Sequence, residues 1–254
     1  MAEERDDNSV GASRDPEKKE LSPDQITSAF QPIVDLASGL VIGYEALGRL
    51  KGREHEGFRA IVDHIPYHAW GPMLDAALQS ALSRGAERPA GTHLFVNVSV
   101  RQGWQLTKED VKTALIQGPV VIELPERVER MVDWAQLRTH LKNLNLELAM
   151  DDFGAGVGDF ERLMAIHPHW LKLDYGITAQ LSDEAWGRRL VKALQTAMEE
   201  GGVKVIAEGI EKITTLGWLR EIGTRYGQGF LLARPQISEH GWSQAIPMDS
   251  LEED

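Results

Sequence analysis

The sequence predicts an α/β fold, and three observations indicate a closed (β/α) barrel within that class. Short apolar runs recur along the chain, with helical segments between them. The number of these strand–helix units suits a barrel. Polar residues also gather where the strands end, which is the edge on which barrels carry their active sites. An open doubly wound sheet shares the same alternation and is the alternative.

Composition limits the classes of protein that fit. The chain has 254 residues, 42% of them hydrophobic, which suits one main domain with a sizeable core. It contains no cysteine, so disulfides and thiolate chemistry are excluded. No apolar run reaches the length of a membrane span, and residues 1–20 lack the apolar core of a signal peptide, so we expect a cytoplasmic protein. A formal net charge of −12 argues against bulk nucleic acid as a partner.

The ends of the chain differ from its middle. Residues 1–20 are rich in charge and contain no aromatic side chain, so we expect a disordered tail there. The folded domain should cover 21–248, and residues 249–254 should form a short C-terminal tail. Ser22 followed by Pro23 and Gln25 is typical of a helix start.

The predicted elements then alternate along the chain. Apolar runs at 30–36 and 40–47 flank Ala37-Ser38-Gly39, which predicts a hairpin and therefore an antiparallel first pair of strands. The further strands are expected at 93–98, 120–124, 146–150, 170–173, 203–208 and 229–232. The helices are expected at 73–85, 107–116, 126–143, 158–166, 177–200 and 211–222.

Two adjacent carboxylates, Asp151 and Asp152, follow the strand predicted at 146–150 and precede a loop bracketed by Gly154 and Gly156. Adjacent carboxylates repel each other, and a divalent cation would hold both ionised, because hard ions take oxygen ligands. A plain Asp-Asp turn after the strand is the alternative.

Polar side chains stand at the ends of most of the predicted strands. A single acidic residue in such a place is usually a helix cap, but a series of them is hard to explain as independent caps. Carboxylate and amide oxygens suit Mg²⁺ or Mn²⁺, and the lack of cysteine and of paired histidines argues against a structural zinc site. The residues are Glu45, Asn97, Glu123, Asp151, Asp152, Lys172 and Glu208, with Gln228 just before the last predicted strand.

Lys172 admits two interpretations. It could neutralise developing charge or orient a water molecule, or it could form a structural ion pair with a neighbouring carboxylate. Two cations a few ångströms apart would activate water and stabilise the leaving oxygen of a phosphate ester. These residues therefore favour metal-assisted hydrolysis of a phosphate ester.

Seven short motifs occur in one order along the chain. They are Tyr44-Glu45-Ala46-Leu47-Gly48-Arg49, Asn97-Val98-Ser99, Glu123-Leu124-Pro125-Glu126, Asp151-Asp152-Phe153-Gly154-Ala155-Gly156, Leu171-Lys172-Leu173-Asp174, Ala207-Glu208-Gly209-Ile210-Glu211 and Tyr226-Gly227-Gln228-Gly229-Phe230. Together they closely resemble the ordered motifs of the EAL-domain family, bacterial phosphodiesterases of the second messenger cyclic di-GMP. The resemblance covers about residues 22–240.

The resemblance implies a fold and an activity. The fold is a modified (β/α)₈ TIM-type barrel with an antiparallel first strand, in agreement with the predicted hairpin. The activity is hydrolysis of cyclic di-GMP to the linear dinucleotide pGpG with Mg²⁺ or Mn²⁺, bound as a pair of ions. Ca²⁺ should permit binding but inhibit hydrolysis, because its larger and looser shell acidifies water less well. A homodimer is also expected.

The resemblance implies roles for single residues as well. One ion would be ligated by Glu45, Asn97, Glu123 and Asp151, and the second by Asp151, Asp152 and Glu208. The catalytic residues would be Lys172, Glu208 and Asp152, with Lys172 orienting or deprotonating a bridging water and Glu208 acting as ligand or general base. The substrate site would include Gln31, Arg49, Asp174 and Gln228. Glu126 would anchor the loop after Asp152, and Glu211 is a further motif carboxylate.

Two positions depart from the family pattern. Gly48 stands where an apolar residue is frequent, and Tyr175-Gly176 where a basic residue is frequent.

Two alternative functions stay open. A catalytically silent EAL module could act as a receptor for the nucleotide or as a scaffold, although silent members lose ligands that this chain keeps. A metal-dependent barrel enzyme of another kind, such as a lyase, would explain the acidic strand ends but not Gln31 or Arg49.

Overall fold

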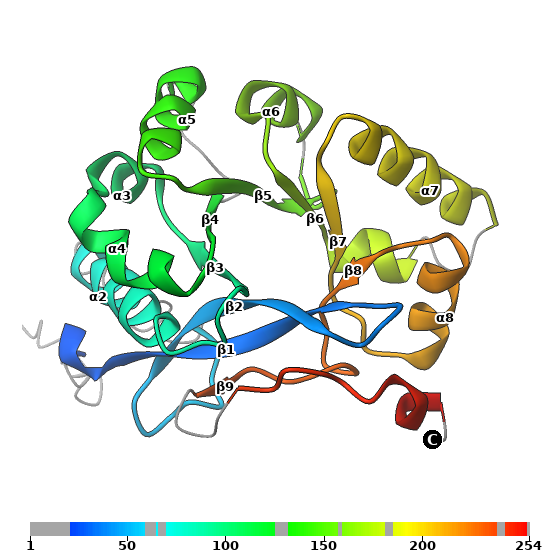
Figure 1. The fold of residues 1–254 in the computed structure, drawn as a ribbon, viewed down its shortest axis with the longest axis horizontal. Helices are drawn as coiled ribbons and strands as arrows, with labels where there is room; N and C mark the ends of the chain where they lie inside the picture. Colours follow the sequence, from blue (N-terminus) through cyan, green and yellow to red (C-terminus); the bar gives the residue numbers. More distant parts are fainter. Residues whose placement is uncertain are drawn as a thin grey trace, which may run out of the picture.

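The structure is a computed structural model that describes residues 21–58, 65, 70–124, 132–156, 159–180, 185–237 and 242–252. Eight strands in this part of the chain close a barrel with helices around it (Figure 1). Neighbouring strands follow the order β2, β3, β4, β5, β6, β7, β8 and β1, and β1 also pairs with β2, which closes the ring. The predicted barrel is therefore confirmed, and the open sheet is excluded.

The strands carry the following bounds: β1 Ile26–Asp35, β2 Val41–Leu50, β3 His93–Asn97, β4 Val120–Leu124, β5 Glu147–Phe153, β6 Trp170–Leu173, β7 Lys204–Ala207 and β8 Tyr226–Gly227. A short ninth strand, β9 Gln236–Ile237, pairs with β1 outside the ring. All pairs from β2 to β8 are parallel.

The first strand runs against its neighbours, as predicted. β1 is antiparallel both to β2 and to β8. The turn of the β1–β2 hairpin contains Gly39 at a φ of 74°, a conformation that favours glycine. The register places Gln31 opposite Glu45, so the hairpin brings two predicted site residues together.

Helices cover the outer side of the barrel. They are α2 Trp70–Gly85, α3 Val100–Gln105, α4 Lys108–Gln117, α5 Trp134–Asn143, α6 Asp159–Ile166, α7 Ala185–Glu200 and α8 Ile213–Glu221. Thr107 caps α4 in a reciprocal pair with Asp110, as the sequence indicates. The predicted helix start at Ser22 is a single 3₁₀ turn, η1 Pro23–Gln25. The predicted helix over 177–200 is in part a π-helical turn, η3 Gly176–Gln180, followed by α7.

The last predicted strand was placed wrongly. Residues 229–232 do not form a strand, and β8 ends at Gly227, so Gln228 directly follows the strand instead of preceding it. A Cβ at Gly229 would lie 2.2 Å from the carbonyl oxygen of Ile210, so the backbones meet too closely there for a side chain. Phe230, one of the apolar residues of this predicted strand, is 47% exposed.

Large side chains fill one end of the barrel. Ile33, Phe95, Val121, Ala149, Trp170, Ile206 and Tyr226 form a buried cluster inside the ring. The Trp170 indole donates a hydrogen bond to Glu147 Oε2 at 2.6 Å, which satisfies its polar edge. A second and larger apolar cluster joins the strands to the helices. The polar side chains of the barrel lie at the other end, where the parallel strands have their carboxyl ends.

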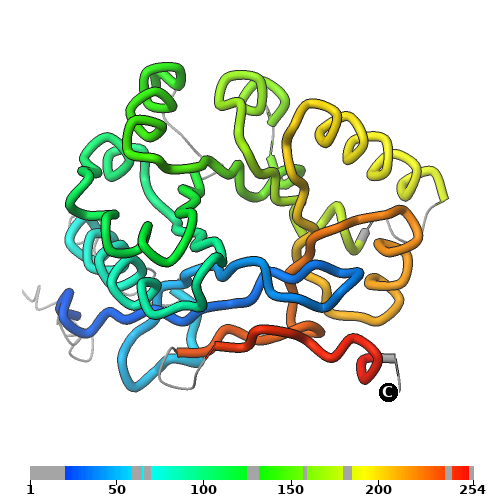
Figure 2. Tube along the Cα trace, viewed as in Figure 1, coloured from blue at the N-terminus to red at the C-terminus, as the bar shows by residue number. Residues whose placement is uncertain are grey.

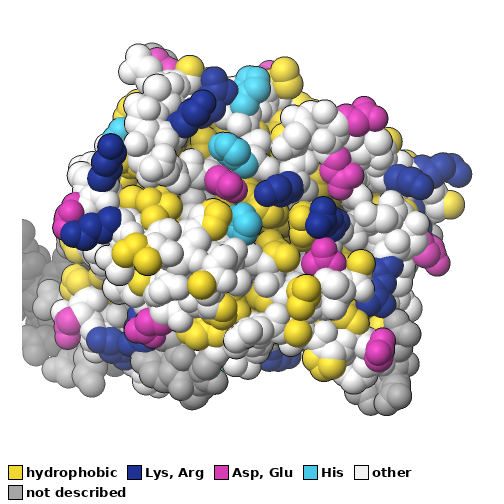
Figure 3. Space-filling model, in the orientation of Figure 1, with side chains coloured by type: hydrophobic (Ala, Val, Ile, Leu, Met, Phe, Trp, Pro, Cys, Tyr) yellow, Lys and Arg dark blue, Asp and Glu magenta, His cyan; other side chains and the backbone are white. Residues whose placement is uncertain are grey.

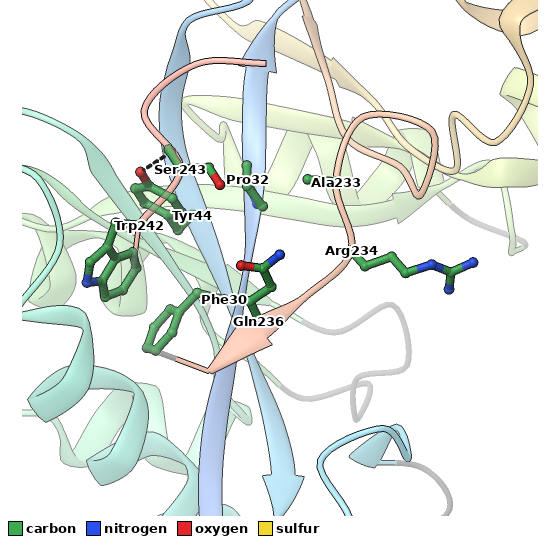
Figure 4. A pocket seen from close by; sticks show the side chains of 8 residues that line it. All are labelled: Phe30, Pro32, Tyr44, Ala233, Arg234, Gln236, Trp242 and Ser243. Atoms are coloured by element: carbon green, nitrogen blue, oxygen red, sulfur yellow. Dashed lines mark hydrogen bonds between the residues drawn. The ribbon is translucent and has the colours of Figure 1, made fainter. Parts of the chain in front are cut away.

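The segment after Trp242 runs along the β1–β2 hairpin, where Leu40 pairs with Ala245, and Figure 2 shows the red segment beside the blue hairpin. Tyr44 Oη donates to the carbonyl oxygen of Ser243 at 2.6 Å, as the dashed line in Figure 4 shows. The Trp242 ring packs on the rings of Phe30 and Tyr44, with centroids 4.7 Å apart in both pairs. A 3₁₀ helix, η6 Met248–Glu252, ends the described segment, and its Leu251 packs on the core.

The side chains of Figure 4 line a small cavity on this outer side of the hairpin. Its volume is ≈ 10 Å³, about enough for one water molecule, so a nucleotide does not fit. Tyr44 faces this cavity. Because side chains alternate along a strand, the neighbouring Glu45 points into the barrel.

Charges of both signs lie interspersed on the described part of the face drawn in Figure 3. The tail predicted over 1–20 falls outside the described residues. Among the described helices, none has the length and hydropathy needed to cross a membrane. The expected cytoplasmic location stays a prediction.

Candidate active site

Four carboxylates meet one ammonium group at the carboxyl end of the barrel. Lys172 on β6 is 1% exposed, and its Nζ lies 3.2 Å from Glu45 Oε2, 2.8 Å from Glu123 Oε1, 2.9 Å from Asp151 Oδ1 and 2.9 Å from Glu208 Oε1. These residues come from β2, β4, β5 and the end of β7. The strand ends that the sequence singled out therefore converge on one point, the Lys172 cluster.

Amide side chains frame the Lys172 cluster. Asn97 Nδ2 donates to Glu45 Oε1 and to Glu123 Oε2, both at 3.0 Å. Gln228 Nε2 donates to Glu45 Oε2 at 2.8 Å and to Gln31 Oε1 at 3.0 Å. The Gln31 amide in turn donates to the carbonyl oxygen of Ala233 at 3.0 Å. These bonds hold the carboxylates in fixed orientations, because each amide has partners on two sides.

Burial and charge shift the proton affinities in this cluster. Burial alone would lower the pKa of Lys172, but the carboxylates of Asp151, Glu123, Glu208 and Glu45 outweigh it and hold the pKa well above its ordinary value. Burial, with the charge of Glu45, raises the pKa of Glu123 well above its usual range. Burial likewise raises the pKa of Glu208. At Glu45 burial would raise the pKa, but the Lys172 ammonium and the hydrogen bonds from Gln228 and Asn97 together outweigh it and lower the pKa.

The Asp151-Asp152 pair sits on an irregularity of β5. The pairing of β5 with β6 shifts register between Met150 and Phe153, and Asp152 has a φ of 54°, in the left-handed region. Burial and the neighbouring charge of Asp151 raise the pKa of Asp152 to about 6. One carboxylate oxygen from each of Asp151, Asp152 and Glu208 lies within 4.8 Å of the others.

The donor set fits a divalent cation. The cluster is rich in carboxylate and amide oxygens. Among the described residues, Gln228 Oε1 is buried without a hydrogen-bond donor, and the Lys172 ammonium is the cationic partner of both Glu123 Oε1 and Asp151 Oδ1. Oxygen atoms of this kind are the ligands that Mg²⁺ and Mn²⁺ prefer. The acidic group of Asp151, Asp152 and Glu208 could hold a cation on the same grounds.

The loop after Asp152 is tied by a residue that the sequence reasoning missed. Gly154 has a φ of 104°, and its N–H donates to Asp159 Oδ2 at 2.7 Å. Asp159 is 7% exposed at the start of α6. A carboxylate in the first turn of the predicted helix was the available signal. The anchor that the sequence predicted, Glu126, lies outside the described residues.

Three further predicted residues lie around the Lys172 cluster without joining it. Arg49, 8% exposed, lies on the same face of β2 as Glu45, and its guanidinium donates to the carbonyl oxygen of Gly48 at 2.8 Å. Asp174 follows β6, and its Oδ1 accepts a hydrogen bond from the Gly176 N–H at 2.7 Å. Glu211 is exposed before α8, and in the part of the chain that the structure describes no ion pair joins it to the cluster.

Both departures from the family pattern have a structural reason. A Cβ at Gly48 would lie 2.5 Å from the ring of Phe58, so this ring occupies the space of the missing side chain. The Tyr175 ring covers Gly209, where a Cβ would lie 2.4 Å from its Cδ2. Phe58 thus fills the space beside Gly48, and Tyr175 itself packs on the glycine that follows Glu208.

Comparison with known proteins identifies relatives of this chain. The family model for the EAL domain matches residues 17–235. The cyclic di-GMP phosphodiesterase PA2567 of Pseudomonas aeruginosa is 27% identical over 227 residues, which cover 83% of this chain and 38% of that protein. The chain spans 38–46% of the length of the first curated relatives that it matches.

Two solved structures share the fold. The manganese and cyclic di-GMP complex of Klebsiella pneumoniae BlrP1 matches with a TM-score of 0.73 and 25% identity, over 87% of this chain and 58% of that one. The Bacillus subtilis YkuI protein, with an EAL domain, in complex with substrate c-di-GMP and calcium, matches with a TM-score of 0.73 and 21% identity, over 91% of this chain and 60% of that one. With a family model that matches most of its residues, the chain belongs to the EAL-domain family.

Proposed function

We propose that this protein is a metal-dependent phosphodiesterase that hydrolyses cyclic di-GMP to linear pGpG. The observation that carries the proposal is the convergence of four carboxylates on Lys172 Nζ, at distances of 2.8–3.2 Å. The names of the curated relatives give the substrate. Bacterial second-messenger signalling is the setting that this substrate implies.

The cofactor in this proposal is Mg²⁺ or Mn²⁺, bound as two ions. Bound cations would neutralise phosphate charge and acidify a water molecule. Glu45, Asn97, Glu123 and Asp151 would hold one ion, and Asp151, Asp152 and Glu208 the other. The second set has its oxygens within 4.8 Å of one another, and the solved relatives contain manganese or calcium with cyclic di-GMP.

The chain's own residues would divide the remaining work. Lys172 would keep its proton, because the surrounding carboxylates raise its pKa, and would orient the attacking water and neutralise charge on the phosphate. Asp152, with a pKa of about 6, and Glu208, whose pKa burial raises, could each accept a proton near neutral pH. Glu208 would act either as the general base or as a metal ligand, and kinetic measurements distinguish these two roles.

The substrate would be held from the side of the hairpin. Arg49 offers a planar fork of donors that suits a phosphate oxygen. Gln31 is oriented by its hydrogen bond to Ala233 and by the Gln228 amide. Asp174 would support the site from the end of β6, and Glu126 would anchor the loop after Asp152. We also propose that the protein forms a homodimer. Light scattering of the protein as it elutes from a size-exclusion column measures its mass and tests this.

Turnover with defined metals tests the proposal. Purified protein is incubated with cyclic di-GMP in Mg²⁺ or Mn²⁺, with and without EDTA, and the products are separated by chromatography. We expect pGpG in either metal and none in EDTA. Tight binding without turnover in any metal would replace the enzyme by a silent receptor or scaffold.

A further inference from the structure

The segment from Asp174 to Thr178, here called the β6–η3 bracket, contacts two loops that carry carboxylates. On one side, Ile177 packs on Gly154, where a Cβ would lie 2.1 Å from Ile177 Cδ1. Gly154 also has a φ of 104°, so the loop after Asp152 passes the bracket in a conformation that needs glycine. This contact fixes the loop that follows Asp151 and Asp152.

On the other side, the bracket holds the backbone of Glu208. Thr178 is 0% exposed, and its Oγ1 donates to the carbonyl oxygen of Glu208 at 2.6 Å. The Tyr175 ring lies directly on Gly209, which has a φ of 66°. The Glu208 N–H also donates to the carbonyl oxygen of Leu173 at 3.1 Å, so hydrogen bonds hold both the N–H and the carbonyl of the Glu208 backbone.

The bracket is rigid in itself. The N–H groups of Ile177 and Thr178 donate to the carbonyl oxygen of Asp174 at 3.0 and 3.1 Å, and the Asp174 side chain accepts from Gly176. The Asp174 N–H donates to the carbonyl oxygen of Phe153 at 3.1 Å. The π-helical turn η3 begins inside the bracket, at Gly176, and is a rare element that occurs often at functional sites.

We propose that the β6–η3 bracket is a positioning element that sets the spacing between the Asp151-Asp152 pair and Glu208, with Thr178 as the positioning residue on the Glu208 side. Thr178 touches no carboxylate oxygen. Its hydroxyl lies 2.6 Å from the Glu208 carbonyl oxygen, and 3.2 and 3.4 Å from the carbonyl oxygens of Tyr175 and Asp174 within the bracket, so it reaches the site through the Glu208 backbone. The inference rests on the proposed function, because it assigns to this spacing the binding of a cation by Asp151, Asp152 and Glu208. Cation affinity should then depend on a hydroxyl that is itself no ligand.

Calorimetric titration of the whole protein with Mn²⁺, without substrate, tests this role. Thr178→Val keeps the side-chain shape and removes the hydroxyl. We expect it to weaken Mn²⁺ binding about tenfold, the effect of one buried hydrogen bond. Thr178→Ser keeps the hydroxyl and should bind Mn²⁺ within about twofold of the wild type. If the protein hydrolyses cyclic di-GMP, the Mn²⁺ concentration that gives half of the maximal rate should rank the variants in the same order as the Mn²⁺ affinity does.

Thr224→Val is the matched control. Thr224 is 5% exposed and also loses a buried hydroxyl bond, to Gln195 Oε1 at 2.9 Å, but it lies before β8 at the opposite end of the barrel. Its Mn²⁺ affinity should be unchanged. Wild-type affinity in Thr178→Val, or an equal loss in Thr224→Val, would overturn the proposal, because the effect would then be absent or merely one of stability.

A second variant tests the bracket if the first does not fold, and a separate measurement of hydrolysis distinguishes failure of the bracket from failure of the proposed function. If Thr178→Val fails to fold, Ile177→Val removes the Cδ1 methyl that lies over Gly154 and should weaken Mn²⁺ binding about threefold. An unchanged affinity in that variant counts against the bracket. Wild-type protein that binds Mn²⁺ but does not hydrolyse cyclic di-GMP refutes the proposed function alone, since the titrations still test the bracket. Wild-type protein that binds no Mn²⁺ refutes both.

Discussion

Replacing Lys172 with methionine tests whether one ammonium group neutralises the buried carboxylates. Its Nζ lies 2.8–3.2 Å from oxygens of four of them. In the metal-free variant at least one carboxylate more than in the wild type must take up a proton, because an unpaired buried charge costs more. A carboxyl group with an ordinary pKa of 4.5 does so at pH 7 at a cost of about 3.4 kcal/mol. We expect the free energy of unfolding to fall by about this amount.

The sign of the pH dependence follows from proton linkage. The folded variant binds more protons than its unfolded chain, so its stability rises as the pH falls. The gap to the wild type should narrow by about 1.4 kcal/mol per pH unit between pH 7 and about pH 5, for each carboxylate that takes up a proton. Urea unfolding in EDTA at several pH values measures this gap.

Lys204→Met is the control for this experiment. Lys204 is exposed at the start of β7, and its Nζ lies 4.3 Å from the centre of the Trp170 ring. Its loss should cost about 1 kcal/mol or less at every pH. A Lys172→Met gap that does not change with pH, or that is no larger than the control's, would refute the neutralising role.

Further predictions concern the cluster, the metal and the barrel's other end. Asp151→Asn and Glu45→Ala should each abolish turnover while circular dichroism shows an intact fold, and near wild-type rates would contradict their assignment as ligands. Ca²⁺ should support binding of cyclic di-GMP in calorimetry but suppress hydrolysis, and substantial turnover in Ca²⁺ would count against the mechanism. Arg88→Met should lower the free energy of unfolding by about 3–5 kcal/mol, because the buried guanidinium donates to five backbone carbonyls; a urea midpoint near that of the wild type would contradict this.

Periodicity was enough to predict most of the barrel. The strands from β3 to β7 are buried on both faces and therefore read as continuous apolar runs. The last strand could not be placed this way, because its position depends on how closely Gly227 and Gly229 approach Leu36 and Ile210. The short α3 was missed, although the pair of Ser99 and Gln102 that caps it is a recognisable signal.

The carboxylates of the site could be predicted from the sequence, because the carboxyl ends of parallel strands lie at the same end of a barrel. The side chains of Glu45, Glu123, Asp151 and Glu208 meet at Lys172 because parallel strands bring their carboxyl ends together. The supports of the site were not predictable, since they are contacts between segments far apart in the chain. Thr178 reaches Glu208 across 30 positions, and no local pattern indicates such a bond.

Isotope incorporation tests the central claim most directly. Cyclic di-GMP is incubated with the purified protein and Mn²⁺ in H₂¹⁸O, and the product is analysed by mass spectrometry. Hydrolysis at the Lys172 cluster predicts pGpG that carries one ¹⁸O atom on its terminal phosphate, and no product in EDTA. A product without the label would indicate a lyase, and unchanged nucleotide would indicate a receptor; either result would contradict the account.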